Sequence, residues 1–247
     1  MPKLLSNPTL AHVLPLAVFL VFTSLPGLFL IDNTQLPWWR HAPEQWVYPL
    51  QTLVVGALLL VFRKHYTFKP FRGFGLAVLL GFVGIVLWLL PAFIYQKLTA
   101  SGVEVPEWAE WFGLAPRLDG FDPSFFQENT FWYVSALVMR FIRMVVIVAF
   151  AEEIFWRGFL MRYVQADGDP FLRVPFGKHS WAAFGIVTVC FMVAHNSVDW
   201  LGALIFGSLM YFLAVRTKSL GACVLMHAVA NLLLGIYVVA TKQWGFW

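Results

Sequence analysis

The sequence is dominated by apolar segments of about 20 residues, and this feature restricts the folds open to the chain. A helix needs about 20 apolar residues to cross a hydrocarbon layer about 30 Å thick. Of the 247 residues, 60% are hydrophobic and only 12% are charged, whereas soluble domains carry about 25% charged residues. The alternating ten-residue strands that a membrane β-barrel needs are not recognisable. We therefore expect an all-α, polytopic transmembrane helical bundle.

About seven segments are long and apolar enough to be interpreted as spans, and we assign them to a single membrane domain, 1–247. Within it, 1–130 holds the N-terminal spans and a long loop, and 131–247 is a core that carries the polar motifs described below. The first segment lacks the basic region and cleavage site of a signal peptide, so we interpret it as a helix of the mature protein. The expected spans are Val13–Ile31, Trp46–Phe62, Phe74–Tyr95, Ser135–Tyr163, Trp181–Asn196, Leu201–Val215 and Leu220–Ala240.

The distribution of charge predicts the orientation of the spans. The loop Arg63–Arg72 is strongly basic and has no acidic residue, which is typical of cytoplasmic loops. The connection Gln96–Asn129 is acidic and is expected to face outward, with its carboxylates at Glu104, Glu107, Glu110, Asp119, Asp122 and Glu128. This scheme places the N-terminus inside and the C-terminus outside. Because the basic residues cluster at span ends, the net charge of +4 does not indicate a nucleic-acid partner.

Two arginines near the start of the fourth span, Arg140 and Arg143, allow two interpretations. They could extend to the interface or face the interior of the bundle. They could instead anchor a carboxylate of a substrate.

The later spans contain few polar residues, and most of these occur in pairs four residues apart. The pairs are Glu153 with Arg157, His195 with Asp199, and His227 with Asn231. Residues four apart share one face of a helix. Polar groups in membrane helices avoid lipid and face the bundle interior or a hydrated cavity. We expect the three stripes to converge on one site, although a single pair of this kind often only joins helices.

Glu152 lies outside these pairs, next to Glu153, and its position suggests chemistry. We expect Glu153 and Arg157 to form an ion pair, which leaves Glu152 as a general base for water. His195 could share that water, and the His227 imidazole and Asn231 amide could donate to an oxyanion. Together these groups suffice to hydrolyse an amide bond without a covalent intermediate.

Other hydrolytic sites receive less support from the sequence. Neither a GxSxG nor an HExxH motif is present. Two histidines and a glutamate could hold zinc, and in that case Glu152, His195 and His227 would be the ligands. Otherwise we expect no metal and no other cofactor.

The motifs resemble those of the CAAX protease and bacteriocin-processing (Abi) family of intramembrane glutamate endopeptidases, also called type II CAAX endopeptidases. "EEIFWR" (Glu152–Arg157) fits EExxxR, "FMVAH" (Phe191–His195) fits FxxxH, and "HAVAN" (His227–Asn231) fits HxxxN. The resemblance covers about Leu137 to Ala240, and the ordered trio of motifs is more specific than any one of them.

The resemblance implies an intramembrane endopeptidase. The eukaryotic and archaeal relatives remove three residues after a prenylated cysteine; in them, the residues matching Glu152 and His195 activate water, and those matching His227 and Asn231 form the oxyanion hole. Glu153, Arg157 and Asp199 would then be supporting residues. The expected partners are the lipid bilayer and a membrane-embedded or lipid-anchored peptide: a prenylated CAAX protein, a bacteriocin precursor or a C-terminal sorting tail. The short basic loops suggest a bacterial inner membrane. A non-catalytic immunity or scaffold protein on the same fold is the alternative.

Overall fold

The structure, a computed structural model, describes residues 5–33, 35–118 and 120–247, and over these residues it contains helices and no strand. The predicted all-α class is confirmed. The chain forms two compact units, each built from two stretches of sequence. Unit 1 comprises Met1–Thr67 and Phe121–Phe155, and unit 2 comprises Phe68–Gly120 and Trp156–Trp247. The assignment to one membrane domain with a boundary at residue 130 stays a prediction.

Helices occur at all of the expected spans, and six of them within the described residues are long and apolar enough to cross a membrane. The chain is therefore a multi-pass membrane protein. The remaining apolar helix, Trp181–Val193, is shorter and ends three residues before the expected boundary. The six long helices are Pro8–Phe29, Glu44–Val61, Phe74–Ala100, Thr130–Tyr163, Ser197–Thr217 and Leu220–Thr241.

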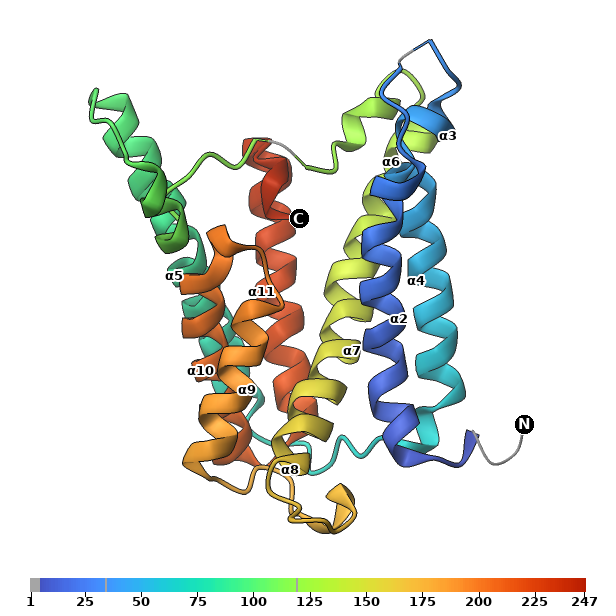
Figure 1. Cartoon of the computed structure of the whole chain (residues 1–247), viewed down its shortest axis with the longest axis vertical. Helices are drawn as coiled ribbons and strands as arrows, with labels where there is room; N and C mark the ends of the chain where they lie inside the picture. Colours follow the sequence, from blue (N-terminus) through green and yellow to red (C-terminus); the bar gives the residue numbers. More distant parts are fainter. Residues whose placement is uncertain (1–4, 34, 119) are drawn as a thin grey trace. The chain divides into compact units, whose positions relative to one another are not determined.

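Unit 1 is a set of helices that run side by side (Figure 1). Its elements are α2 (Pro8–Phe29), the short α3 (Trp38–His41), α4 (Glu44–Val61), α6 (Thr130–Phe141) and α7 (Ala149–Glu153). The Asn7 side chain caps α2 by accepting a hydrogen bond from the amide of Leu10, and Asn129 caps α6 in the same way. Such caps satisfy amides that a helix start leaves unpaired.

A polar bridge joins the helices of unit 1. The buried Gln51 of α4 donates from Nε2 to the carbonyl oxygen of Phe19 at 2.6 Å and to Oγ1 of Thr23 at 2.9 Å, both on α2. Its Oε1 accepts a 2.6 Å hydrogen bond from Nε of Arg143. Arg140 is also buried, with its guanidinium 5.2 Å from the ring centre of Tyr48. Both arginines therefore lie inside unit 1, in agreement with the first interpretation of these residues.

Unit 2 is organised around α5 (Phe74–Ala100), which packs against α10 (Trp200–Thr217) and α11 (Leu220–Thr241). The helix α9 (Trp181–Val193) packs on α10, and α8 (Met161–Tyr163) precedes it. The backbones of α5 and α11 approach closely at Gly81, where an added Cβ would lie 2.8 Å from the carbonyl oxygen of Met226. A small residue is therefore required at this crossing, as is common between membrane helices.

We predict that Gly81→Ala destabilises the protein, because the carbonyl of Met226 belongs to the backbone and cannot rotate away from the new methyl group. The expected loss is about 1–3 kcal/mol in the free energy of unfolding, measured by SDS-induced unfolding in detergent micelles. Gly75→Ala in the same helix is the control. Nothing lies within 4 Å of the Cβ position at Gly75, so this change should be neutral or slightly stabilising. Equal effects of the two changes would show that the crossing is not tight.

Candidate active site

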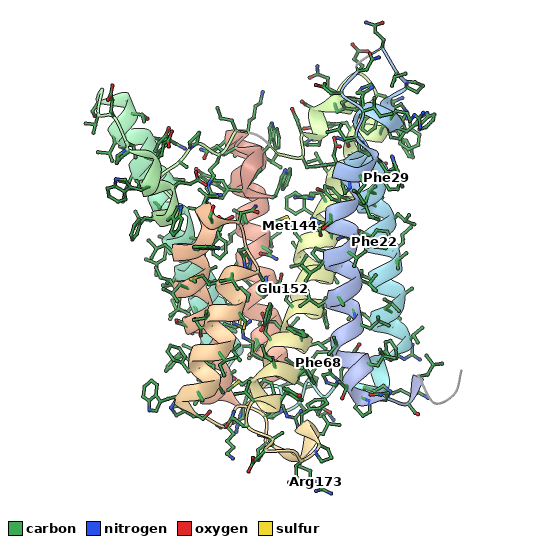
Figure 2. The ribbon with its side chains drawn as sticks, viewed as in Figure 1. Phe22, Phe29, Phe68, Met144, Glu152 and Arg173 are labelled. Atoms are coloured by element: carbon green, nitrogen blue, oxygen red, sulfur yellow. The ribbon has the colours of Figure 1, made fainter. Side chains whose placement is uncertain are left out.

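The two adjacent carboxylates lie in α7, near the middle of the long helix Thr130–Tyr163, and Figure 2 labels Glu152 on it. Glu152 is half-buried and Glu153 is fully buried. A π-helical stretch precedes them, Ile142–Val148, and a second one follows, Ile154–Leu160. Such stretches use i→i+5 hydrogen bonds and occur often at functional sites. Both carboxylates belong to unit 1, whereas Arg157 and the residues of the other two motifs belong to unit 2.

The ring of Phe191, the first residue of FxxxH, connects two motifs within unit 2. The fully buried guanidinium of Arg157 lies over it at 5.0 Å from the ring centre. On the same ring packs the imidazole of His195, with 4.6 Å between the ring centres. Arg157 also donates from Nη2 to the carbonyl oxygen of Gly207 at 3.4 Å. The Phe191 ring therefore links the EExxxR and FxxxH motifs, because it contacts the guanidinium of Arg157 and the imidazole of His195.

The predicted helical stripe of His195 and Asp199 is wrong, because α9 ends at Val193. His195 lies in the turn that follows, and Asp199 ends the short 3₁₀ turn Ser197–Asp199 before α10. The imidazole is nevertheless fixed. Nδ1 of His195 lies 2.8 Å from the carbonyl oxygen of Phe191. Since a carbonyl oxygen only accepts, Nδ1 carries the proton, and in the neutral ring Nε2 holds the lone pair.

His227 and Asn231 lie one turn apart on α11, and a second aromatic ring connects His227 to the Phe191 cluster. Phe206 of α10 stacks on Phe191 with ring centres 6.3 Å apart, and it also contacts the buried His227 ring at 5.6 Å. An added Cβ at Gly84 would lie 2.7 Å from Cδ2 of Phe206, so this glycine makes room for the ring. The structure thus places Arg157, His195 and His227 on one cluster of stacked aromatic side chains in unit 2.

Asp199 forms an ion pair that the sequence did not reveal. Its Oδ1 accepts hydrogen bonds from Nη2 of Arg117 at 2.8 Å and from Nε1 of Trp88 at 3.2 Å. Arg117 also donates to the carbonyl oxygen of Val198 at 2.8 Å. The Trp88 ring in turn packs against the His195 imidazole, with ring centres 5.4 Å apart. Asp199 therefore holds the ring that supports His195.

A pocket of about 470 Å³ lies beside the turn that carries His195. It is lined by Asn196, Ser197 and Val198 of that turn, and by Glu110, Arg117 and other residues of the long connection. Oγ of Ser197 donates to Oε1 of Glu110 at 3.2 Å. The acidic connection thus forms a wall of this pocket. Asp119, another carboxylate of that connection, lies outside the described residues.

A match with a known family covers the part of the chain that carries the three motifs. Residues 134–233 match the family model of type II CAAX prenyl endopeptidase Rce1-like proteins. All three motifs, from Glu152 to Asn231, lie inside the matched range, and the resemblance to the CAAX protease family that they predicted is confirmed. The matched family is a family of proteases. Neither a curated protein nor a solved structure matches the chain.

Sequence reasoning about the CAAX protease motifs missed Trp88, Arg117 and Phe206, the side chains that hold the motif residues in place. Arg117 lies 82 residues before Asp199 along the chain, and no spacing rule connects them. Trp88 and Phe206 read as ordinary apolar residues of their spans. The only available signal was Arg117 itself, as one of few cations in a loop rich in carboxylates.

Within either unit, the described residues include no group of three or more His, Cys, Asp or Glu side chains arranged to hold a metal. The tautomer of His195 would suit a metal ligand as well as a base, because metal-bound histidines commonly donate their second N–H to a carbonyl. The zinc alternative at Glu152, His195 and His227 draws on both units and stays a prediction.

We predict that Asp199→Asn destabilises the protein by about 3 kcal/mol, because the change leaves the buried Arg117 guanidinium without its counter-charge. The side chain of Arg117 is 4% exposed and that of Asp199 is 13% exposed. The ion pair of Asp169 with Arg173 is the control, since its side chains are 60% and 71% exposed and Asp169→Asn should cost less than about 1 kcal/mol. SDS-induced unfolding in detergent would measure both losses, and a small loss for Asp199→Asn would contradict the structural role.

Proposed function

We propose that the protein is an intramembrane endopeptidase that hydrolyses a peptide bond of a membrane-associated protein or peptide with water activated by Glu152. Support comes above all from one observation: the Phe191 ring and its neighbour Phe206 bring Arg157, His195 and His227, one residue from each motif, onto a single aromatic cluster. The match of 134–233 to a protease family supports the same class of reaction.

In this proposal Glu152 is the general base. It lies five residues before Arg157 along the chain and belongs to the same motif. His195 presents Nε2 as an acceptor, since Nδ1 is used by the carbonyl of Phe191. Nε2 therefore orients the water by accepting one of its protons in a hydrogen bond, while the Glu152 carboxylate removes the other.

The attacked carbonyl becomes an oxyanion, and we assign its stabilisation to His227 and Asn231. Both are on α11 one turn apart, so that an imidazole N–H and an amide N–H are presented by one rigid element. Donors placed before the reaction lower the energy of the tetrahedral intermediate, and each is worth about 10²–10³ in rate. The proton held by Glu152 then passes to the leaving amine, which restores the carboxylate.

Glu153, Arg157 and Asp199 have supporting roles in this mechanism. Glu153 and Arg157 are fully buried and four residues apart, and a buried charge requires a partner of opposite sign. An ion pair between them would leave the neighbouring Glu152 as the reactive carboxylate. Asp199 acts through Trp88 on the position of His195.

The proposed substrate is embedded in the bilayer or anchored to it by a lipid, because the EExxxR and HxxxN motifs lie on helices long enough to span a membrane and His195 lies two residues before a third. A prenylated CAAX protein, a bacteriocin precursor and a C-terminal sorting tail all have this property. We propose an inner membrane of a bacterium as the location, with the N-terminus inside, on the basis of the basic loop Arg63–Arg72 and the acidic connection.

We predict that Glu152→Gln and His195→Ala abolish cleavage, with losses of about 10²–10⁴ in rate, while the variants still fold. The measurement is enrichment and mass spectrometry of new peptide termini in membranes of cells that express the wild type or a variant. Farnesylated and unmodified CAAX peptides are assayed with the purified protein in nanodiscs.

Glu107→Gln is the matched control, because it removes an exposed carboxylate of the acidic connection and should leave cleavage unchanged. If termini generated by the wild type persist in folded Glu152→Gln protein, the proposed chemistry is wrong. If wild type and Glu152→Gln give identical termini and both protect cells against a bacteriocin, the non-catalytic immunity alternative holds.

A separate prediction concerns metals. We expect purified, active protein to contain less than one equivalent of zinc and to keep its activity after dialysis against a strong chelator, because carboxylate and imidazoles alone supply the proposed base and donors. Metal content is measured by plasma mass spectrometry on the same sample. Loss of activity that returns only with added zinc would assign Glu152, His195 and His227 as ligands instead.

A further inference from the structure

A second pocket lies in unit 2, at the end where α10 stops and α5 starts. Its volume is about 670 Å³. Three cationic side chains line it, Arg72, Arg216 and Lys218, and Leu76, Phe212 and Val215 supply an apolar wall. Among the described residues that line it, none is acidic. The CAAX protease motifs contribute no residue to this pocket.

The pocket lies at the boundary of the apolar helices. α10 ends at Thr217 and α5 begins at Phe74, and both are long enough to span a membrane. α9 packs antiparallel to α10 (Figure 1) and begins at this same end with Trp181, which is 78% exposed. Exposed tryptophans are enriched where lipid headgroups meet the hydrocarbon. The exposed Phe212 makes the apolar wall accessible from the lipid-facing surface of α10.

The three cations differ in how they are bound, and this difference leaves donors available. Nζ of Lys218 donates to the carbonyl oxygen of Gly177, which holds this side chain in place. Nε of Arg72 donates to the carbonyl oxygen of Thr217 at 2.5 Å and so caps the C-terminal end of α10. This bond uses only Nε, so the terminal amino groups of Arg72 are available for an anion. The guanidinium of Arg216 is exposed and lines the same pocket.

The backbone keeps this pocket in shape. Gly73 has φ +76° and immediately precedes α5, and an added Cβ would overlap the side chain of Thr217. The loop before α5 therefore rests directly on the end of α10. This contact fixes Arg72 near Arg216, so that two guanidinium groups face one pocket without a carboxylate partner among its lining residues.

We propose that this pocket binds the headgroup of an anionic phospholipid, with its phosphate on Arg72 and Arg216 and an acyl chain along Leu76, Phe212 and Val215. Guanidinium groups bind phosphate oxygens in a bidentate geometry, and basic pockets between membrane helices are suited to anionic headgroups. The apolar wall selects a lipid over a free phosphate, because a soluble anion would gain nothing from it. The bound lipid would contact both α5 and α10 at the surface of the helix bundle.

The test is the thermal unfolding midpoint of the full chain in neutral detergent, with added phosphatidylglycerol or phosphatidylcholine. We expect phosphatidylglycerol to raise the midpoint by about 3 °C or more beyond phosphatidylcholine, because a ligand that binds only the folded state stabilises it. Arg216→Glu should remove most of this difference. Arg216 is exposed, so this variant is expected to fold.

Lys69→Glu is the matched control. Lys69 belongs to the same basic loop as Arg72 and is exposed, but it does not line the pocket. It should keep the full response to phosphatidylglycerol, and Arg216→Lys should restore part of it. An equal loss in both charge-reversal variants would mean diffuse attraction to the basic surface and would overturn the proposal. So would an unchanged response in Arg216→Glu, or an equal rise with inorganic phosphate or glycerol 3-phosphate at the same concentration.

Discussion

The packing around the motif residues of unit 2 depends on one aromatic ring, that of Phe191. Phe191 lies under the guanidinium of Arg157 and against the imidazole of His195, and both contacts replace water with a polarisable apolar surface. Cations over aromatic faces gain most where the surroundings are dry. The ring therefore determines where the end of the long helix and the end of α9 can lie, and Phe206 extends the same stack to His227.

Around this stack, glycines supply the space that the large rings need. Added Cβ atoms at Gly84, Gly202 and Gly207 would lie 2.7 Å from Phe206, 2.9 Å from Trp88 and 3.1 Å from Phe191. Each of these aromatic side chains therefore packs against a glycine of the facing helix. Since helices in lipid gain little from hydrophobic association, such close packing is their main source of affinity. The same contacts place the imidazoles, so stability and positioning of the site rest on the same atoms.

The sequence was a good guide to the helices, because spans in lipid must be long, apolar and internally hydrogen-bonded. It also identified the residues of all three motifs. It failed at His195, where the pattern of residues four apart suggested one continuous helix, although the chain turns after Val193. The partner of Asp199 was hidden for a different reason: Arg117 is distant in sequence, and the contact depends on how a loop folds back. The two π-helical stretches were also missed, since their composition does not differ from that of an α-helix.

The π-helical stretches determine how a change in the length of this helix affects the direction of its carboxylates. A π-helical turn accommodates one more residue than an α-helical turn, so the azimuth of Glu152 depends on the winding of Ile142–Val148 as well as on its number of residues. A single-residue deletion in an α-helical part of this helix would turn the carboxylates by about 100° relative to the preceding half of the helix, whereas a deletion in Ile142–Val148 that restores α-helical winding would remove the extra residue and largely keep their azimuth. Ile142–Val148 is therefore a part of the helix where the loss of one residue can be absorbed by a change in winding, so that Glu152 keeps its direction.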